Sequence, residues 1–163
     1  MRIREYEPED APLLAELFAR SVRHYGPRAY DPLQVEAWPA GASAEATALR
    51  CADGRTVLVA MDEDGRPLGY VDLEADGHLD HLYCAPDAEG KGIGSALYAA
   101  IEDQARRLGI GRIQVEASAL ARALFERNGF EPIARNEVRI GPATLHNFRM
   151  EKKLDTGQEP ATG

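Results

Sequence analysis

A glycine-rich segment is the part of this chain whose residue types and spacing most clearly suit chemistry. It reads EGKGIGS over residues 89–95 and runs directly into a segment of helical periodicity. Glycine tolerates unusual φ values and lets a ligand approach the backbone closely, and the free N–H groups at a helix start attract anions. The segment therefore suits the phosphates of a nucleoside triphosphate, a dinucleotide or coenzyme A, but it also suits a tight turn that binds nothing.

Residue spacing argues against the first of these ligands and weakens the second. A triphosphate-binding Walker loop ends in Gly-Lys-Ser/Thr, whereas Lys91 is followed here by Gly92. A dinucleotide fingerprint G-x-G-x-x-G/A that starts at Gly90 would need its third glycine at Ser95. Glu116 does stand about where a ribose-binding acid would, but a spacer with a proline separates the preceding strand from the loop. A nicotinamide dinucleotide-binding enzyme is therefore the weaker alternative, and the glycines alone do not choose between coenzyme A and no ligand.

The elements that must position this segment follow from hydrophobic periodicity and turn residues. Asp-Gly pairs at 64–65 and 76–77 lie between apolar runs and predict hairpins. The element order β, α, α, β, β, β, α, β, α, β, β predicts an α+β fold. Strands are expected over residues 1–6, 55–62, 67–75, 78–84, 111–117, 130–140 and 143–154. Helices are expected over residues 8–22 and 30–38, with a further turn or two over 43–50, then from the loop to 108 and over 118–129.

Composition sets the broad class of the protein. The chain has 163 residues, of which 44% are hydrophobic and 28% charged, and its formal charge is −8. We expect one soluble domain over residues 1–154 and a polar, disordered tail over residues 155–163. The negative charge argues against nucleic acid as a partner. Cys51 and Cys84 have no disulfide-framework or metal-ligand spacing, and the N-terminus has no apolar stretch, so we expect no metal, no membrane partner and a cytoplasmic location.

The loop and its flanks resemble the GNAT superfamily of N-acetyltransferases. The family signature Gln/Arg-x-x-Gly-x-Gly/Ala stands here as EGKGIG over residues 89–94. The strand, proline, loop and helix of residues 82–97 and the segment SALARALFERNGFEP over residues 118–132 are similar to the flanking elements of the family. The resemblance covers residues 1 to about 154. It implies a GNAT-like α+β fold, in which a mixed, mostly antiparallel central sheet of about seven strands is flanked by about four helices and splays between strands four and five.

The resemblance also implies acetyl-CoA as cosubstrate, wedged into the splay. The backbone of strand four would bind the pantetheine arm and the loop amides would bind the pyrophosphate. Glu89 departs from the usual Gln or Arg and puts a negative side chain near the phosphates, from which we expect it to point away. Phe125 replaces a tyrosine that protonates the leaving thiolate in many members, so no general acid is assigned; water and Tyr83 are the alternatives. The residues implied to contact the cofactor are Leu82, Tyr83, Cys84, Glu89, Gly90, Lys91, Gly92, Ile93, Gly94, Ser95, Ser118 and Phe125.

Catalysis of N-acetylation places one demand on the acceptor side. A lysine-like amine with a pKa of ~10.4 is mostly protonated at neutral pH, so a general base is useful. Side chains alternate along a strand, and His78 and Asp80 share parity with Leu82 and Cys84. Many family members place a catalytic Glu or a His pair at the matching positions. We therefore predict that Asp80 or His78 accepts the ammonium proton, the alternative being two solvent-exposed residues at a strand end.

The acceptor itself is the least constrained part of the prediction. The final strand and the helices expected over the acceptor site contribute Tyr30, Trp38, His146 and Asn147 as predicted substrate-binding residues. The resemblance implies an amine of a small molecule or a peptide, which attacks the thioester directly, without an acyl-enzyme. A non-catalytic acyl-CoA-binding module is the alternative function, to which Phe125 and Glu89 give weight. Both a monomer and a homodimer are compatible with the sequence.

Overall fold

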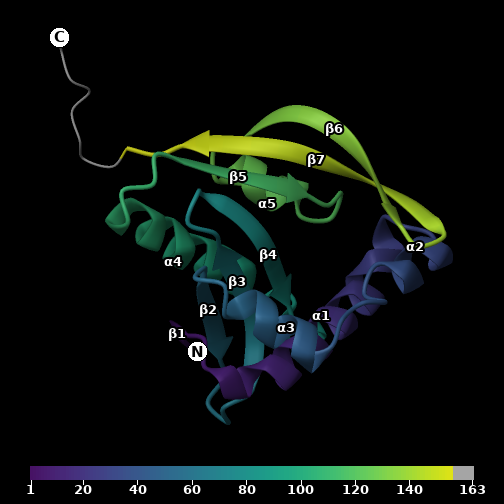
Figure 1. Cartoon of the computed structure of the whole chain (residues 1–163), viewed down its shortest axis with the longest axis horizontal. Coiled ribbons are helices and arrows are strands. Elements are labelled where there is room, and N and C mark those ends of the chain that lie inside the picture. The colour runs from purple at the N-terminus through teal and green to yellow at the C-terminus, as the bar shows by residue number, and fades with distance from the viewer. Residues whose placement is uncertain (156–163) are drawn as a thin grey trace.

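Residues 1–155 are described by the computed structural model, which arranges them as one seven-stranded sheet with packed helices (Figure 1). The predicted tail of residues 155–163 lies, except for its first residue, outside the described residues. The strands are β1 (Arg2–Glu5), β2 (Thr56–Met61), β3 (Pro67–Leu73), β4 (His78–Cys84), β5 (Arg112–Ala117), β6 (Glu131–Ile140) and β7 (Ala143–Lys153). The helices are α1 (Ala11–Tyr25), α2 (Pro32–Ala37), α3 (Ala44–Cys51), α4 (Ile93–Arg107) and α5 (Arg122–Arg127), with 3-10 turns η1 (Pro8–Asp10), η2 (Gly26–Arg28) and η3 (Pro86–Ala88).

The sheet has the order β1-β2-β3-β4-β5-β7-β6, and every neighbouring pair is antiparallel except β4 and β5. Within residues 1–155, β4 pairs with β5 only at His78↔Gln114 and Leu79↔Val115. The two strands diverge beyond these positions, as Figure 1 shows for β4 and β5. The predicted α+β class, the seven strands and the splay between strands four and five are thus confirmed.

Helices cover both faces of the sheet. Alternate residues of a strand point to opposite sides, so one strand can pack against a helix on each face. A Cβ added to Gly69 of β3 would lie 2.9 Å from Leu97 Cδ1, so this face of β3 packs against α4. Asp72 of the same strand forms an ion pair with Arg50 of α3 on the opposite face. The main core fills the space under α4 and is formed by apolar side chains, among them Leu79, Leu97, Ile101, Ile113, Phe125 and Met150.

A β-bulge interrupts β4 in the middle of the strand. Val71 pairs with Leu82, whereas Leu73 pairs with Leu79, so two residues of β4 lie opposite the single residue Asp72 of β3. An extra residue of this kind shifts the two-residue period of the side chains. The side chains before and after the bulge therefore do not keep one parity along β4.

The buried Asp72 carboxylate holds this bulge. Its Oδ1 accepts hydrogen bonds from the backbone N–H groups of Asp80 (3.3 Å) and His81 (3.1 Å). As a result, Cys84 faces α4, where a Cβ on Gly94 would lie 3.7 Å from its Sγ, while Asp80 faces the guanidinium of Arg50 on the other side. The predicted shared face of Asp80 with Leu82 and Cys84 is therefore wrong, and the extra residue in β4 is the reason.

Candidate active site

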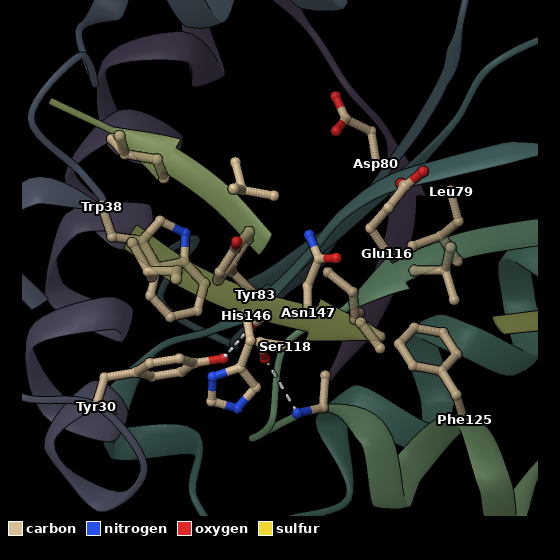
Figure 2. A pocket seen from close by; sticks show the side chains of 17 residues that line it. Tyr30, Trp38, Leu79, Asp80, Tyr83, Glu116, Ser118, Phe125, His146 and Asn147 are labelled. Atoms are coloured by element: carbon tan, nitrogen blue, oxygen red, sulfur yellow. Dashed lines mark hydrogen bonds between the residues drawn. The ribbon is translucent and has the colours of Figure 1, made fainter. Parts of the chain in front are cut away.

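Two cavities meet at the splay of the sheet. The larger, which we call the loop cleft, has a volume of about 500 Å³ and lies over the start of α4. The smaller, which we call the strand pocket, has a volume of about 140 Å³ and lies between β4, β5 and the β6–β7 hairpin (Figure 2). Five residues line both cavities and mark the place where they join: Trp38, Leu82, Tyr83, Ser118 and Ala121.

The shape of the loop cleft depends on the backbone conformation of its glycines. A side chain at these positions would have room. Gly90 and Gly92 have φ values of +77° and +74°, and a Cβ on either would meet no atom within 4 Å. This left-handed region is unfavourable for residues with a side chain. Helix α4 begins at Ile93, and the first N–H groups of a helix have no partner within the helix. The residues that carry these N–H groups line the cleft at the positive end of the helix dipole, which makes the cleft suitable for phosphate oxygens.

Ten of the predicted cofactor residues lie in the wall of the loop cleft. They are Leu82, Tyr83, Cys84, Glu89, Gly90, Gly92, Ile93, Gly94, Ser95 and Ser118. Lys91 is exposed and lies outside this wall. Phe125 lines the strand pocket instead, where it is buried and packs against Tyr98 and Phe130.

The charge of Glu89 is compensated from the N-terminal part of the chain. Its Oε1 lies 2.6 Å from Arg28 Nη1 and its Oε2 lies 3.2 Å from His24 Nε2. The hydrogen bonds from Arg28 and His24 lower the pKa of Glu89 to about 2. Arg28 and Arg127 both line the loop cleft, and neither was predicted from the sequence. No local motif marks Arg28, because it reaches the loop only through the packing of α1 and η2.

The inner end of the strand pocket is aromatic. The Tyr30 ring lies 5.3 Å from Trp38 and 5.7 Å from His146, measured between ring centroids. The Tyr30 hydroxyl donates to the His146 carbonyl oxygen (3.2 Å) and accepts from the Ala119 N–H (2.9 Å), which ties the start of α2 to β7 and to the turn before α5. The predicted residues Tyr30, Trp38, His146 and Asn147 thus come together in one wall.

The opposite end of the strand pocket is polar. Figure 2 shows Asp80, Glu116 and Asn147 on this side, away from the Tyr30 and Trp38 rings. Asn147 Oδ1 is buried and has no hydrogen-bond partner within residues 1–155. A buried, unpaired amide oxygen is costly, so this atom is suited to accept a hydrogen bond from a ligand.

Asp80 is held as an anion by two arginines. Its Oδ2 lies 2.8 Å from Arg55 Nη1 and 3.6 Å from Arg50 Nη1. Burial opposes ionisation of Asp80, but the contacts with Arg55 and Arg50 outweigh it and keep the pKa of Asp80 below its usual value. A carboxylate bound in this way is a poor proton acceptor but a stable negative charge in the pocket.

His78 lies behind the pocket rather than in its wall. Its Nε2 is 2.5 Å from Glu116 Oε2 and its Nδ1 is 3.4 Å from Glu74 Oε1. Burial acts to lower the pKa of His78, but the hydrogen bonds and charges of Glu116 and Glu74 outweigh burial and raise it. Among the predicted catalytic residues, Asp80 therefore reaches the pocket directly, whereas His78 reaches it through Glu116.

Comparisons with known proteins agree with this geometry. A family model described as an acetyltransferase (GNAT) domain matches residues 27–154. The chain belongs to the GNAT family. The GNAT chain is 26% identical to the uncharacterized N-acetyltransferase YafP of Escherichia coli over 153 residues. This alignment covers 94% of this chain and 96% of YafP.

Solved structures of N-acetyltransferases are similar to this GNAT chain. A GCN5-related N-acetyltransferase from Rhodopseudomonas palustris superimposes with a TM-score of 0.86 at 34% identity, covering 94% of this chain and 95% of the other. The PaiA N-acetyltransferase of Thermoplasma acidophilum, solved in complex with coenzyme A, has a TM-score of 0.78 at 22% identity, with 94% and 98% coverage. The protein is therefore a GNAT N-acetyltransferase, and the predicted family and enzyme class are confirmed.

Two further features of the described residues concern membranes and metal ions. No helix in residues 1–155 is long and apolar enough to cross a membrane. The same residues contain no group of three or more His, Cys, Asp or Glu side chains arranged to hold a metal ion.

Proposed function

We propose that this enzyme transfers the acetyl group of acetyl-CoA to the primary amine of a small molecule or a peptide. The observation that carries the proposal is the junction of the two cavities. A thioester that enters through the loop cleft and an amine that enters through the strand pocket would meet beside Tyr83 and Ser118, which line both. Direct attack in a ternary complex needs this arrangement and needs no nucleophile of the enzyme.

Acetyl-CoA fits the loop cleft in three parts. The amides of residues 90–95 would hold the pyrophosphate at the start of α4. The edge of β4 beyond Leu79, which has no pairing with β5, would bind the pantetheine arm through its backbone. Arg28 and Arg127 add positive charge for the phosphates at the cleft wall. The coenzyme A in the Thermoplasma acidophilum relative supports this ligand class.

The chemistry of transfer assigns roles to the strand pocket. Asp80, kept ionised by Arg55, would attract the acceptor's ammonium group and orient it. The neutral amine then attacks the thioester carbon, and coenzyme A leaves as its thiolate. Burial raises the pKa of Tyr83, so its hydroxyl stays protonated and can donate a hydrogen bond to the leaving sulfur. Phe125 has no proton to give, and a thiol pKa of ~8.5 makes a strong acid unnecessary.

The acceptor that suits this pocket is cationic. The proposed acetyltransferase domain comprises residues 1–154. The polar end of the strand pocket carries two carboxylates, and the chain has a formal charge of −8. We propose a cytoplasmic enzyme, consistent with the free thiols of Cys51 and Cys84, that works as a monomer or a homodimer.

The test is release of free thiol from acetyl-CoA with a panel of polyamines, aminoglycosides, arylalkylamines and lysine peptides. Release that depends on both substrates supports the proposal. Tight binding of coenzyme A without release of free thiol for any amine would favour the alternative, a non-catalytic acyl-CoA-binding module. Phe125, at a position where many family members have a tyrosine, supports this alternative. Thermal stabilisation by NAD and not by coenzyme A would exclude both functions.

A further inference from the structure

We propose that Glu116 takes the proton from the acceptor's ammonium group and that His78 passes it on toward Glu74 and solvent. This inference rests on the proposed function, since it concerns the same reaction. Glu116 was not among the predicted catalytic residues.

The strand register brings Glu116 to the polar end of the strand pocket. His78 pairs with Gln114 where β4 and β5 still lie side by side. Glu116 is two residues further along β5 and Asp80 two residues further along β4, so the two carboxylates flank the opening of the splay. Both line the strand pocket, and Figure 2 shows them together at its polar end.

The two carboxylates differ in what holds them. Asp80 is bound by Arg55 and Arg50, cations that never lose their charge at neutral pH. Within residues 1–155, the ion-pair partner of Glu116 is His78, which can lose a proton. A proton on Asp80 would break its arginine contacts, whereas a proton on Glu116 can move into the contact that it already makes.

That contact continues away from the pocket. Glu116 Oε2 lies 2.5 Å from His78 Nε2, and His78 Nδ1 on the other side of the ring lies 3.4 Å from Glu74 Oε1. The side chain of Glu74 is 35% exposed, so this end of the chain of groups reaches solvent. Other charged groups on this side include Arg55, 3.2 Å from Glu74, and Asp76, which accepts from the His78 backbone N–H. Arg149 of β7 is the cross-strand neighbour of Glu116.

The proton balance of this step closes. The ammonium nitrogen loses one proton to the Glu116 carboxylate. Neutral His78, with its proton on Nδ1, takes the Glu116 proton at Nε2, and Glu116 is an anion again. The imidazolium releases its Nδ1 proton toward Glu74 and solvent, and proton exchange with solvent restores the Nδ1–H form of the ring. The nitrogen lone pair forms the bond to the thioester carbon, the C–S bond breaks, and the second proton of the nitrogen neutralises the departing thiolate.

An independent observation points to an N–H donor at the same place. Asn147 Oδ1 is buried and unpaired beside this end of the pocket, and an ammonium or amine N–H would supply the missing hydrogen bond. An amine held between Asn147 and Asp80 would lie next to Glu116.

The primary experiment compares Glu116→Gln with Glu126→Gln. Glu126 is a matched control, because both side chains are 45% exposed and each lies 2.5 Å from a basic side chain, which is Arg122 in the case of Glu126. At neutral pH we expect Glu116→Gln to lower kcat/KM for the best amine of the panel by about 100-fold or more. The Kd for coenzyme A, measured by calorimetry, should stay the same in both variants.

A second readout separates proton transfer from a structural defect. If Glu116 removes a proton, the loss in Glu116→Gln should shrink as the pH rises toward the amine's pKa, and it should shrink for a fluorinated analogue of the amine that is already neutral. His78→Gln should show a smaller loss with the same dependence on pH.

Each outcome decides something. Wild-type activity in Glu116→Gln overturns the inference, and so does a loss that is equal at every pH and for both amines. A wild-type enzyme that binds coenzyme A but acetylates no amine of the panel overturns the proposed function first and this inference with it.

Discussion

The loop cleft and the strand pocket are neighbours that are built in opposite ways. Much of the loop cleft comes from one stretch of chain, residues 88–95, and from its backbone conformation. The strand pocket is made of side chains from β4, β5, β6, β7 and the segment around α2. In the proposed arrangement, acetyl-CoA would be bound mainly by backbone features, which tolerate side-chain changes. The amine acceptor would be recognised by side chains that distant elements bring together.

The two cavities also differ in how their charges are held. The ion pairs of Glu89 at the loop cleft are exposed, with Glu89 43% and Arg28 52% exposed. Behind the strand pocket, Asp72 is fully buried and pairs with Arg50 and Arg55, whose side chains are 19% and 6% exposed. Water screens the first set of charges and not the second, so we expect the strand pocket to depend far more on single residues.

Removal of the buried carboxylate should have the largest effect. Asp72→Ala removes the fully buried partner of Arg50 and Arg55 and the acceptor of the bulge N–H groups. The free energy of unfolding should therefore be about 3–5 kcal/mol lower than in the wild type. Chemical denaturation measures this difference. Asp53→Ala is the control, because Asp53 pairs with the same Arg55 at 2.8 Å but is 45% exposed. Equal losses in the two variants would contradict the contrast between buried and exposed charges.

The loop cleft should instead be most sensitive to changes in its backbone conformation. Gly92→Val forces a β-branched residue to a φ of +74° and should cost about 1–2 kcal/mol of stability and weaken coenzyme A binding about 10-fold. Gly109→Val is the matched control, because Gly109 has a φ of +73° near the other end of α4 and also has open space around it. It should lose the same stability and keep its affinity. Calorimetry with coenzyme A that shows equal weakening would mean that the loop acts through stability alone.

The same division explains how far the sequence could predict this molecule. The Asp-Gly hairpins, the glycine loop and the element order are local patterns, and the fold inferred from them is confirmed. The boundaries of short elements were less accurate: the predicted helix over 118–129 is the helix α5, Arg122–Arg127, preceded by a turn that the Ser118 hydroxyl caps at the Ala121 N–H (3.2 Å).

The acceptor end could be predicted only in part. Tyr30, Trp38, His146 and Asn147 do line one pocket, although their roles stay predictions. The bulge opposite Asp72 left no sign in the alternation of β4, and it reversed the expected face of Asp80. The contact of Glu116 with His78 depends on the register of two parallel strands that the whole of α4 separates, which no local pattern encodes.

Acid should destabilise the protein through the bulge. His81 is partly buried, its Nδ1 lies 2.9 Å from the Tyr70 hydroxyl, and desolvation together with Arg50 lowers its pKa below the ordinary value of 6.5. The unfolded state then binds a proton below that pH and the folded state does not. Stability is therefore retained above about pH 6.5 and falls with decreasing pH, by at most about 1.4 kcal/mol per pH unit from this residue.

The variant that tests this is His81→Gln, with the exposed His24→Gln as its control. The pH dependence of the unfolding free energy below pH 6.5 should be shallower in His81→Gln than in the wild type, and unchanged in His24→Gln. A wild-type slope in His81→Gln would place the acid sensitivity elsewhere.

The smallest effect is expected from the exposed charge at the loop cleft. Glu89→Gln removes a negative charge beside the phosphate site and frees Arg28 to meet the ligand, so coenzyme A should bind about threefold more tightly at low salt. Because the pKa of Glu89 is about 2, the gain should not change with pH in the neutral range, and added salt should reduce it. Asp87→Asn is the control, since Asp87 is 68% exposed and lies outside the cleft wall. Weaker binding in Glu89→Gln would instead mean that the carboxylate serves to hold Arg28 in place, and the loop cleft would then share the side-chain dependence of the strand pocket.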